Sequence, residues 1–105
     1  MTAEDIIMAL VVNGGNARSL ALKAVEAAKD KDFEKAEELM RESGDFLGKA
    51  HEFQTQMIQD EINESKTEIS MILIHGQDHL MNAMTVNDLA TQMIEMYRIM
   101  YNENK

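Results

Sequence analysis

The chain has no cysteine and no proline, and only five of its 105 residues are glycine. Without cysteine it can form no disulfide framework and no thiolate zinc site, and it has no cysteine nucleophile. Proline and glycine make most tight turns, so a chain with so few of them is a poor candidate for a multi-stranded β fold or a collagen-like one. These absences favour an all-helical protein.

Basic residues are also scarce. Ten lysines and arginines stand against 19 aspartates and glutamates, which gives a formal net charge of −9. This charge argues against unaided binding to nucleic acid or to an anionic membrane, and it favours a basic protein partner. No apolar run approaches the roughly 20 residues that span a bilayer, and the N-terminus lacks the basic region of a secretory signal. We therefore expect a cytoplasmic protein.

What the chain does contain is enough apolar sequence for one folded domain, which we expect to cover residues 1–105. Hydrophobic residues make up 45% of the chain and charged residues 28%. A chain of this length is one domain at most, and this composition can bury a core.

Helical spacing of apolar residues defines a first segment that begins at Thr2, a predicted N-cap paired with Asp5 in a capping box. Residues 13–16, Asn-Gly-Gly-Asn, predict either a bend or close helix approach within this helix, or a short loop before the helix proper. The segment ends in the polar turn at residues 29–32.

A second helix is predicted from Asp32 to about Ile62, with Gly44 and Gly48 on a side where a neighbouring helix can approach. A third follows a predicted capping box at residues 65–68 and runs to the C-terminus. Because both connections are short, successive helices must be antiparallel neighbours. The predicted fold is all-α, an antiparallel up-down-up three-helix bundle.

The third helix has two apolar faces when its residues are wound at about 100° per residue. Around Asp78, within about 60°, lie Met71, Ile74, Met81 and Thr85, which we call the outer stripe. The opposite side is the predicted core face: Ile69, Ile72, Leu73, Gly76, Leu80, Ala83 and Met84. Two helices of the same chain can cover only one of these faces, so the sequence predicts a homo-oligomer in which copies of this helix cover the other.

Asp78 lies in the middle of the outer stripe. On a closed symmetry axis, several copies of this carboxylate would share protons, retain water or hold a cation, and Mg²⁺ or another hard divalent ion suits such an all-oxygen site. The alternative is an ordinary exposed aspartate on a monomer.

His75 and His79 flank the outer stripe one turn apart, and Gln77 lies on the opposite flank. In a ring of copies, Gln77 of one subunit can approach His75 of the next. A zinc hydrolase would need a glutamate directly after the first histidine, where this chain has Gly76. Two readings remain: a histidine that accepts a phosphoryl group as a nucleophile, or two partly buried surface histidines.

The string Leu73-Ile74-His75-Gly76-Gln77-Asp78-His79-Leu80-Met81 resembles the active-site segment of the lactose/cellobiose/diacetylchitobiose class of enzyme IIA of the bacterial phosphotransferase system. The similarity extends over the chain, through residues 15–19, 32–36, 50–59 and the acidic C-terminus. One departure is Gly76, where the family usually has alanine. His51 belongs to a family-like Ala-His pair, and we interpret it as a structural histidine with satisfied hydrogen bonds rather than a metal ligand.

The resemblance implies a cytoplasmic homotrimer that accepts a phosphoryl group from HPr on His75 and passes it to enzyme IIB, for uptake of a β-linked disaccharide. Gln77 and His79 would line the acceptor pocket, and Asp78 would lie at the trimer axis near a divalent cation such as Mg²⁺. The rival hypothesis is a non-catalytic helical interaction module with a structural metal on the oligomer axis.

Overall fold

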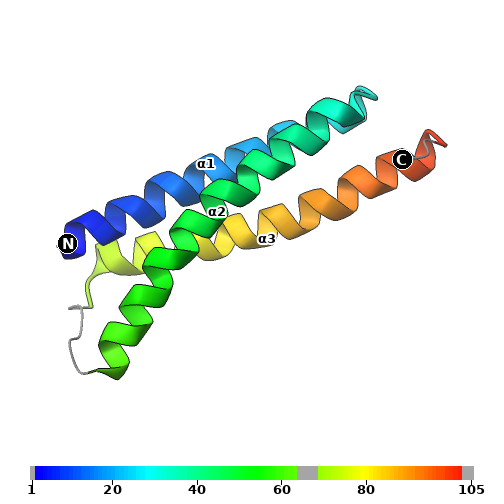
Figure 1. The fold of residues 1–105 in the computed structure, drawn as a ribbon. Helices are drawn as coiled ribbons and strands as arrows, with labels where there is room; N and C mark the ends of the chain where they lie inside the picture. Colours follow the sequence, from blue (N-terminus) through cyan, green and yellow to red (C-terminus); the bar gives the residue numbers. More distant parts are fainter. Residues whose placement is uncertain (1, 64–68, 103–105) are drawn as a thin grey trace.

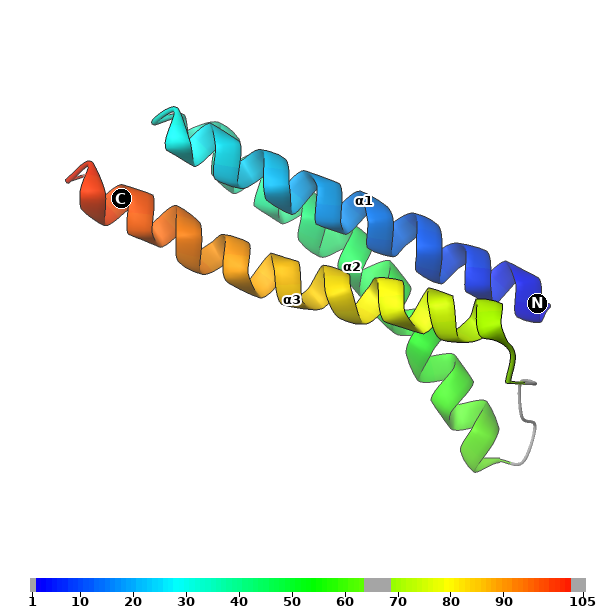
Figure 2. The same cartoon turned by 180° about the vertical axis from the view of Figure 1, so that it is seen from behind.

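The computed structural model describes residues 2–63 and 69–102, which form three helices: α1 (Ala3–Lys29), α2 (Phe33–Ile62) and α3 (Met71–Met100) (Figure 1). Helices α1 and α3 run side by side in the same direction, and α2 runs in the opposite direction (Figures 1 and 2). The molecule measures 53 × 20 × 18 Å along its principal axes. The prediction of an all-α, up-down-up three-helix bundle is confirmed, and no described helix is both long and apolar enough to cross a bilayer.

The first helix begins at the predicted capping box. The Thr2 hydroxyl oxygen accepts a hydrogen bond from the backbone N–H of Asp5, and the Asp5 carboxylate accepts one from the backbone N–H of Thr2, each at 3.1 Å. These bonds lower the pKa of Asp5 below its usual value of 3.8, chiefly because the backbone N–H of Thr2 donates to its ionised form. The start of α1 is therefore set by local sequence alone.

The other two helices also begin at side-chain caps. Asp32 accepts a hydrogen bond from the backbone N–H of Lys35 at 3.2 Å, as predicted. Ser70 accepts one from the backbone N–H of Leu73 at 3.2 Å, so α3 begins at Met71. The capping box predicted at residues 65–68 lies outside the described residues.

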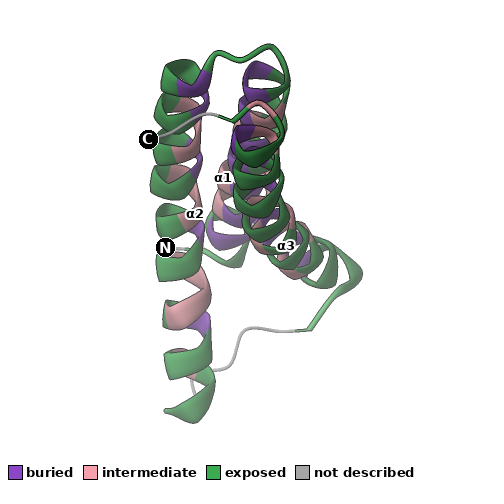
Figure 3. Cartoon of the chain, turned by 90° about the vertical axis from the view of Figure 1, so that its right-hand side faces the viewer, coloured by how far each residue is buried: buried purple, intermediate pink, exposed green. Residues whose placement is uncertain are grey.

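Two apolar clusters hold the bundle together. Figure 3 shows buried residues on the sides of the helices that face one another. The first cluster surrounds the start of α3 and contains Ile6, Ile7, Leu10, Ala50, Met57, Leu73 and Leu80. The second closes the far end and contains Ala24, Ala27, Ala28, Phe33, Ala36 and Ile94. Between the clusters the Ser43 hydroxyl donates to the carbonyl oxygen of Ala17 at 2.7 Å and accepts from the Asn87 amide at 2.9 Å, so one buried serine links all three helices.

Two sequence predictions about glycine have different outcomes. Helix α1 continues through residues 13–16, and a Cβ on buried Gly14 would lie 3.4 Å from the backbone carbonyl of His79, so the close-approach alternative is correct. Gly44 and Gly48 are exposed on α2, and a Cβ at either would meet no atom within 4 Å. The prediction of a helix contact at these two positions is wrong for the described chain, because α2 turns the face of Ser43 and Ala50 toward the bundle instead.

The core face of α3 is confirmed at most positions. Leu73, Gly76, Leu80 and Ala83 are buried, and Met84 is half-buried. The prediction is wrong for Ile69 and Ile72, which are 78% and 60% exposed. Ile69 precedes the helix and Ile72 lies in its first turn. The C-terminal part of α2 diverges from α1 and from the start of α3 (Figures 1 and 2).

Candidate phosphoryl-transfer site

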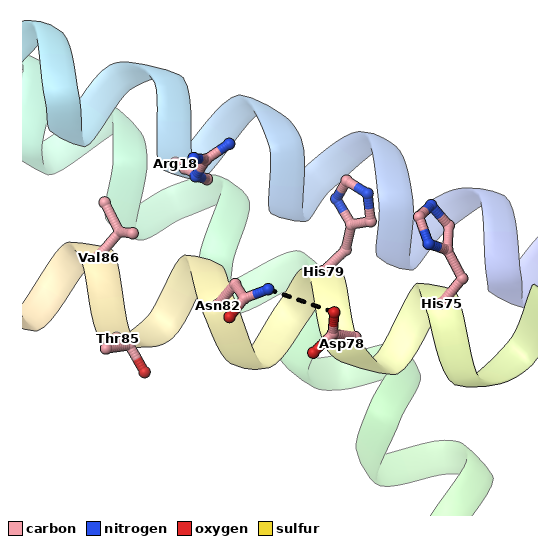
Figure 4. Close-up of a pocket in the computed structure, with 7 residues that line it drawn as sticks. All are labelled: Arg18, His75, Asp78, His79, Asn82, Thr85 and Val86. Atoms are coloured by element: carbon pink, nitrogen blue, oxygen red, sulfur yellow. Dashed lines mark hydrogen bonds between the residues drawn. The ribbon is translucent and has the colours of Figure 1, made fainter.

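A groove of about 420 Å³ runs along α3 on its α1 side (Figure 4). One of its lining residues comes from α1 and six from α3: Arg18, His75, Asp78, His79, Asn82, Thr85 and Val86. The groove therefore brings together three of the four residues predicted from the sequence to form the site.

The two histidines lie edge to face in this groove. Their ring centroids are 4.5 Å apart and their planes are inclined at 75°. His75 is exposed and His79 is half-buried, so a second protein can reach the His75 imidazole. One turn of helix between the two residues produces this contact, since side chains at i and i+4 lie on one face.

Two glycines set the distance between the histidine-bearing helix and α1. Gly76, between the histidines, is buried against α1, where a Cβ would lie 3.5 Å from the Ile7 side chain and 3.6 Å from Leu10. Gly14, which belongs to α1, packs against the backbone of His79 in α3. Alanine at position 76 would make ordinary van der Waals contacts, so this departure from the family pattern leaves the placement of His75 unchanged.

Asp78 is exposed in the same groove and accepts a hydrogen bond from the Asn82 amide at 3.4 Å. The outer stripe around it is also exposed, with Met71, Ile74 and Met81 at 80%, 53% and 50%. The predicted second apolar face of α3 is thus present, and none of the described helices covers it.

Gln77 lies on the other flank of α3 and does not line the groove. Its side-chain oxygen accepts a hydrogen bond from the Gln54 amide at 2.8 Å, and its amide nitrogen lies 4.0 Å from the sulfur of Met57. Both partners belong to α2. A meeting of Gln77 with His75 of a neighbouring copy remains a prediction.

Metal ligands are few within one chain. The part of the chain that the structure describes holds no group of three or more His, Asp and Glu side chains placed to bind a metal ion. His51 is exposed on α2 and lines no part of the groove, and its side chain makes no hydrogen bond to another described residue, so its interpretation as a structural histidine rather than a metal ligand stays a prediction. Of the residues with a described placement, Asp78 alone offers a carboxylate in the groove, so a metal site there would need donors from further copies of the chain.

Sequence reasoning assigned no role to Arg18 or Asn82. Asn82 follows Asp78 at i+4, the spacing at which helical side chains meet, and that spacing could have identified it. Arg18 reaches the groove from another helix, so no spacing within α3 could have found it.

Comparison with known proteins identifies the class. Residues 5–98 match the family model described as "PTS system, Lactose/Cellobiose specific IIA subunit". The lichenan-specific phosphotransferase enzyme IIA component of Bacillus subtilis (strain 168) is 47% identical over 94 residues, which cover 90% of this chain and 86% of that protein.

Two solved structures share the fold. The crystal structure of the cellobiose-specific enzyme IIA from Bacillus anthracis is 45% identical, with a TM-score of 0.94, and the match covers 99% of this chain and 95% of that one. The enzyme IIA of the N,N'-diacetylchitobiose branch of Escherichia coli, solved in complex with HPr, is 38% identical with a TM-score of 0.82; the match covers 96% and 98%.

The fold and these relatives define a phosphotransferase component of sugar transport. The chain belongs to the lactose/cellobiose-specific enzyme IIA family of the phosphotransferase system.

Proposed function

We propose that this enzyme IIA is a phosphoryl carrier that accepts a phosphoryl group from phospho-HPr on His75 and passes it to its cognate enzyme IIB. The observation that carries the proposal is the exposed imidazole of His75 at a groove, in contact with a second imidazole. The E. coli relative bound to HPr supports HPr as the donor. The relatives' names, which include lichenan, diacetylchitobiose and cellobiose, support a β-linked disaccharide as the final acceptor.

The chemistry needs little from the protein beyond a free nitrogen and correct placement. An unprotonated ring nitrogen of His75 attacks phosphorus, so that a P–N bond to His75 forms while the P–N bond to the donor histidine breaks. The donor ring regains a proton and the second nitrogen of His75 loses one to solvent. In the next step the bond to His75 breaks as the bond to the acceptor of enzyme IIB forms, which restores the free imidazole.

His79 and Gln77 are the proposed donors to the transferring oxygens. The His79 ring already lies against His75. Gln77 would approach from a neighbouring copy, since within its own chain it faces α2. Donors held in place before the reaction stabilise the transferring group without reorganisation during it.

The assembly that we propose is a cytoplasmic homotrimer in which copies of α3 cover one another's outer stripe. Isolated chains would leave Met71, Ile74 and Met81 in water. Three Asp78 carboxylates would then meet near the axis. Their oxygen donors fit a hard divalent cation such as Mg²⁺, which would offset the charge repulsion between them. The role of this cation would be architectural.

The test is to incubate the protein with phosphoenolpyruvate, enzyme I and HPr and to measure an acid-labile phosphoryl adduct. His75→Ala should form none and should retain its helicity by circular dichroism. His79→Ala should still be phosphorylated, but more slowly, because the acceptor remains while one donor is lost. His51→Ala, which changes an exposed histidine outside the groove, is the matched control and should behave as wild type. An adduct on His75→Ala would overturn the assignment, and a wild type without any adduct would favour the non-catalytic interaction module.

A further inference from the structure

Arg18 differs from the other cations on the described helices. Each of the other lysines and arginines on these helices has an aspartate or glutamate three or four residues away on its own helix. The corresponding positions around Arg18 are Gly14, Gly15, Ala21 and Leu22. Arg18 also makes no hydrogen bond or ion pair within the described residues, whereas Arg98 pairs with Glu37. The Arg18 guanidinium is therefore available to a group that the described part of the chain does not supply.

The place of Arg18 indicates what that group is. Among residues 2–63 and 69–102, it is the only lysine or arginine that lines the groove of His75 and His79, and the only carboxylate there is the exposed Asp78. A phosphoryl group on His75 would add a charge of about −1.5 to −2 beside this carboxylate. The chain as a whole already carries −9. A cation held by Asp78 on the proposed axis would offset that carboxylate, but the added charge on His75 would still be stabilised by a cation that contacts the phosphoryl oxygens themselves.

The register of α1 against α3 brings the guanidinium toward the histidines. Gly14 packs on the backbone of His79, and Arg18 lies one turn further along α1, on the wall of the same groove (Figure 4). Helical side chains lean toward the N-terminus of their helix, and α1 and α3 run in the same direction, so Arg18 leans back toward His79. Along the helix axes, the backbones of Arg18 and His75 are about two turns, or about 12 Å, apart. The arginine side chain and a phosphorylated imidazole together are long enough to span this distance. Because Arg18 is exposed and pairs with no other residue that the structure describes, it can extend into this space without breaking a bond to one of them.

We infer that Arg18 is a catalytic residue of this carrier: its guanidinium donates hydrogen bonds to the phosphoryl oxygens while the group is on His75. This inference rests on the proposed function. It adds no covalent step, since the P–N bonds form and break as described above and the guanidinium stays protonated throughout. Arginine suits this role better than lysine because it stays charged at any physiological pH and its planar fork can pair with two oxygens at once.

The experiment compares four proteins, wild type, Arg18→Gln, Arg18→Lys and Arg41→Gln, with phospho-HPr as the donor. Arg41 is the matched control, an exposed arginine on α2 outside the groove, with carboxylates at i−4 and i+4. We expect Arg18→Gln to accept the phosphoryl group about tenfold more slowly, less than the loss of a fully buried oxyanion donor would cost. Arg18→Lys should recover part of the rate, and Arg41→Gln should match wild type.

A second measurement separates a catalytic role from a structural one. In a ³¹P NMR titration of the phosphorylated proteins, a nearby guanidinium favours the dianion and lowers the pKa of the phosphoryl group. Arg18→Gln should move this titration to higher pH, and Arg41→Gln should leave it in place. A wild-type rate and an unmoved titration in Arg18→Gln would overturn the inference, as would a loss of trimer or melting temperature with the titration unmoved. A wild type that accepts no phosphoryl group would instead show that the proposed function itself is wrong.

Discussion

Gly14 of α1 lies directly against the backbone of His79 in α3, where a Cβ would come within 3.4 Å of both the carbonyl carbon and the carbonyl oxygen. The contact lets the two helices approach closely beside the histidine pair. It therefore fixes the register of α1 against α3, and with it the position at which Arg18 lines the groove. A glycine in α1 therefore helps to set the position of Arg18 relative to the histidines of α3.

Enlarging residue 14 should disturb the site, whereas enlarging its neighbour should not. Gly14→Val would force branched methyl groups into the His79 backbone, and overpacking of this kind costs about 1–3 kcal/mol. We expect a lower melting temperature and slower phosphorylation. Gly15→Ala is the control, because a Cβ there meets no atom within 4 Å and alanine is the better helix former by about 1 kcal/mol. A Gly14→Val protein as stable as Gly15→Ala would show that the helices are not in close contact at this level.

Much of the fold follows from local chemistry that can be read in the sequence. The Thr2–Asp5 capping box and the Asp32 cap each need only residues within four positions of one another, and both are present. The apolar spacing of α3 identified its exposed outer stripe correctly because a regular helix fixes the angle between any two of its side chains.

Errors arose where a second helix decides the outcome. A helical wheel identifies a small-residue side at Gly44 and Gly48 but does not tell whether a neighbour approaches it, and in the described chain none does. Ile72 has a core-face angle, yet it is exposed in the first turn of α3, and the C-terminal part of α2 diverges from the start of that helix. Arg18 was missed for the same reason, since its place in the groove depends on the register between α1 and α3.

Ser43 provides a test of the polar link between the helices. Its hydroxyl is fully buried, donates to the Ala17 carbonyl and accepts from Asn87. Ser43→Ala would remove the added donor to the Ala17 carbonyl and leave the half-buried Asn87 amide without this acceptor, and an unpaired group that is buried costs about 1–3 kcal/mol. We expect a clear fall in the free energy of unfolding measured by chemical denaturation.

Thr91→Ala is the comparison for Ser43→Ala. The Thr91 hydroxyl is exposed and donates only to the backbone of its own helix, so its loss should change stability by less than about 0.5 kcal/mol. Equal effects of the two substitutions would mean that the buried link contributes nothing beyond a surface hydroxyl.

The net charge of −9 predicts how phosphorylation should respond to salt. If the donor presents a basic face, attraction speeds the encounter, and ions screen that attraction beyond about 8 Å at physiological ionic strength. We expect the second-order rate of phosphoryl transfer from phospho-HPr to fall severalfold between low and physiological salt. Sucrose at the same osmolality should have no such effect. A rate independent of ionic strength would exclude electrostatic steering of the donor.

In the proposed trimer, Asp78 should lower the stability of the assembly and make that stability depend on a bound cation. Three carboxylates brought together within the outer stripe repel one another, and removing each from water costs several kcal/mol unless a cation or shared protons offset the charge. Leucine has a similar volume and neither cost. We therefore expect Asp78→Leu to remain trimeric, to melt at a higher temperature than wild type in chelator, and to lose any dependence of its melting temperature on added Mg²⁺.

The same substitution at Asp88 separates this effect from a general gain in hydrophobicity. Asp88 is also exposed on α3 but lies outside the outer stripe, so Asp88→Leu should keep the wild-type response to Mg²⁺. His75 should remain phosphorylatable in both variants, because the role that we propose for the Asp78 carboxylate is architectural. Melting curves with and without chelator, combined with sedimentation, decide the matter. An Asp78→Leu protein that dissociates to monomers, or that melts below wild type in chelator, would show that this carboxylate does not lie on a buried axis.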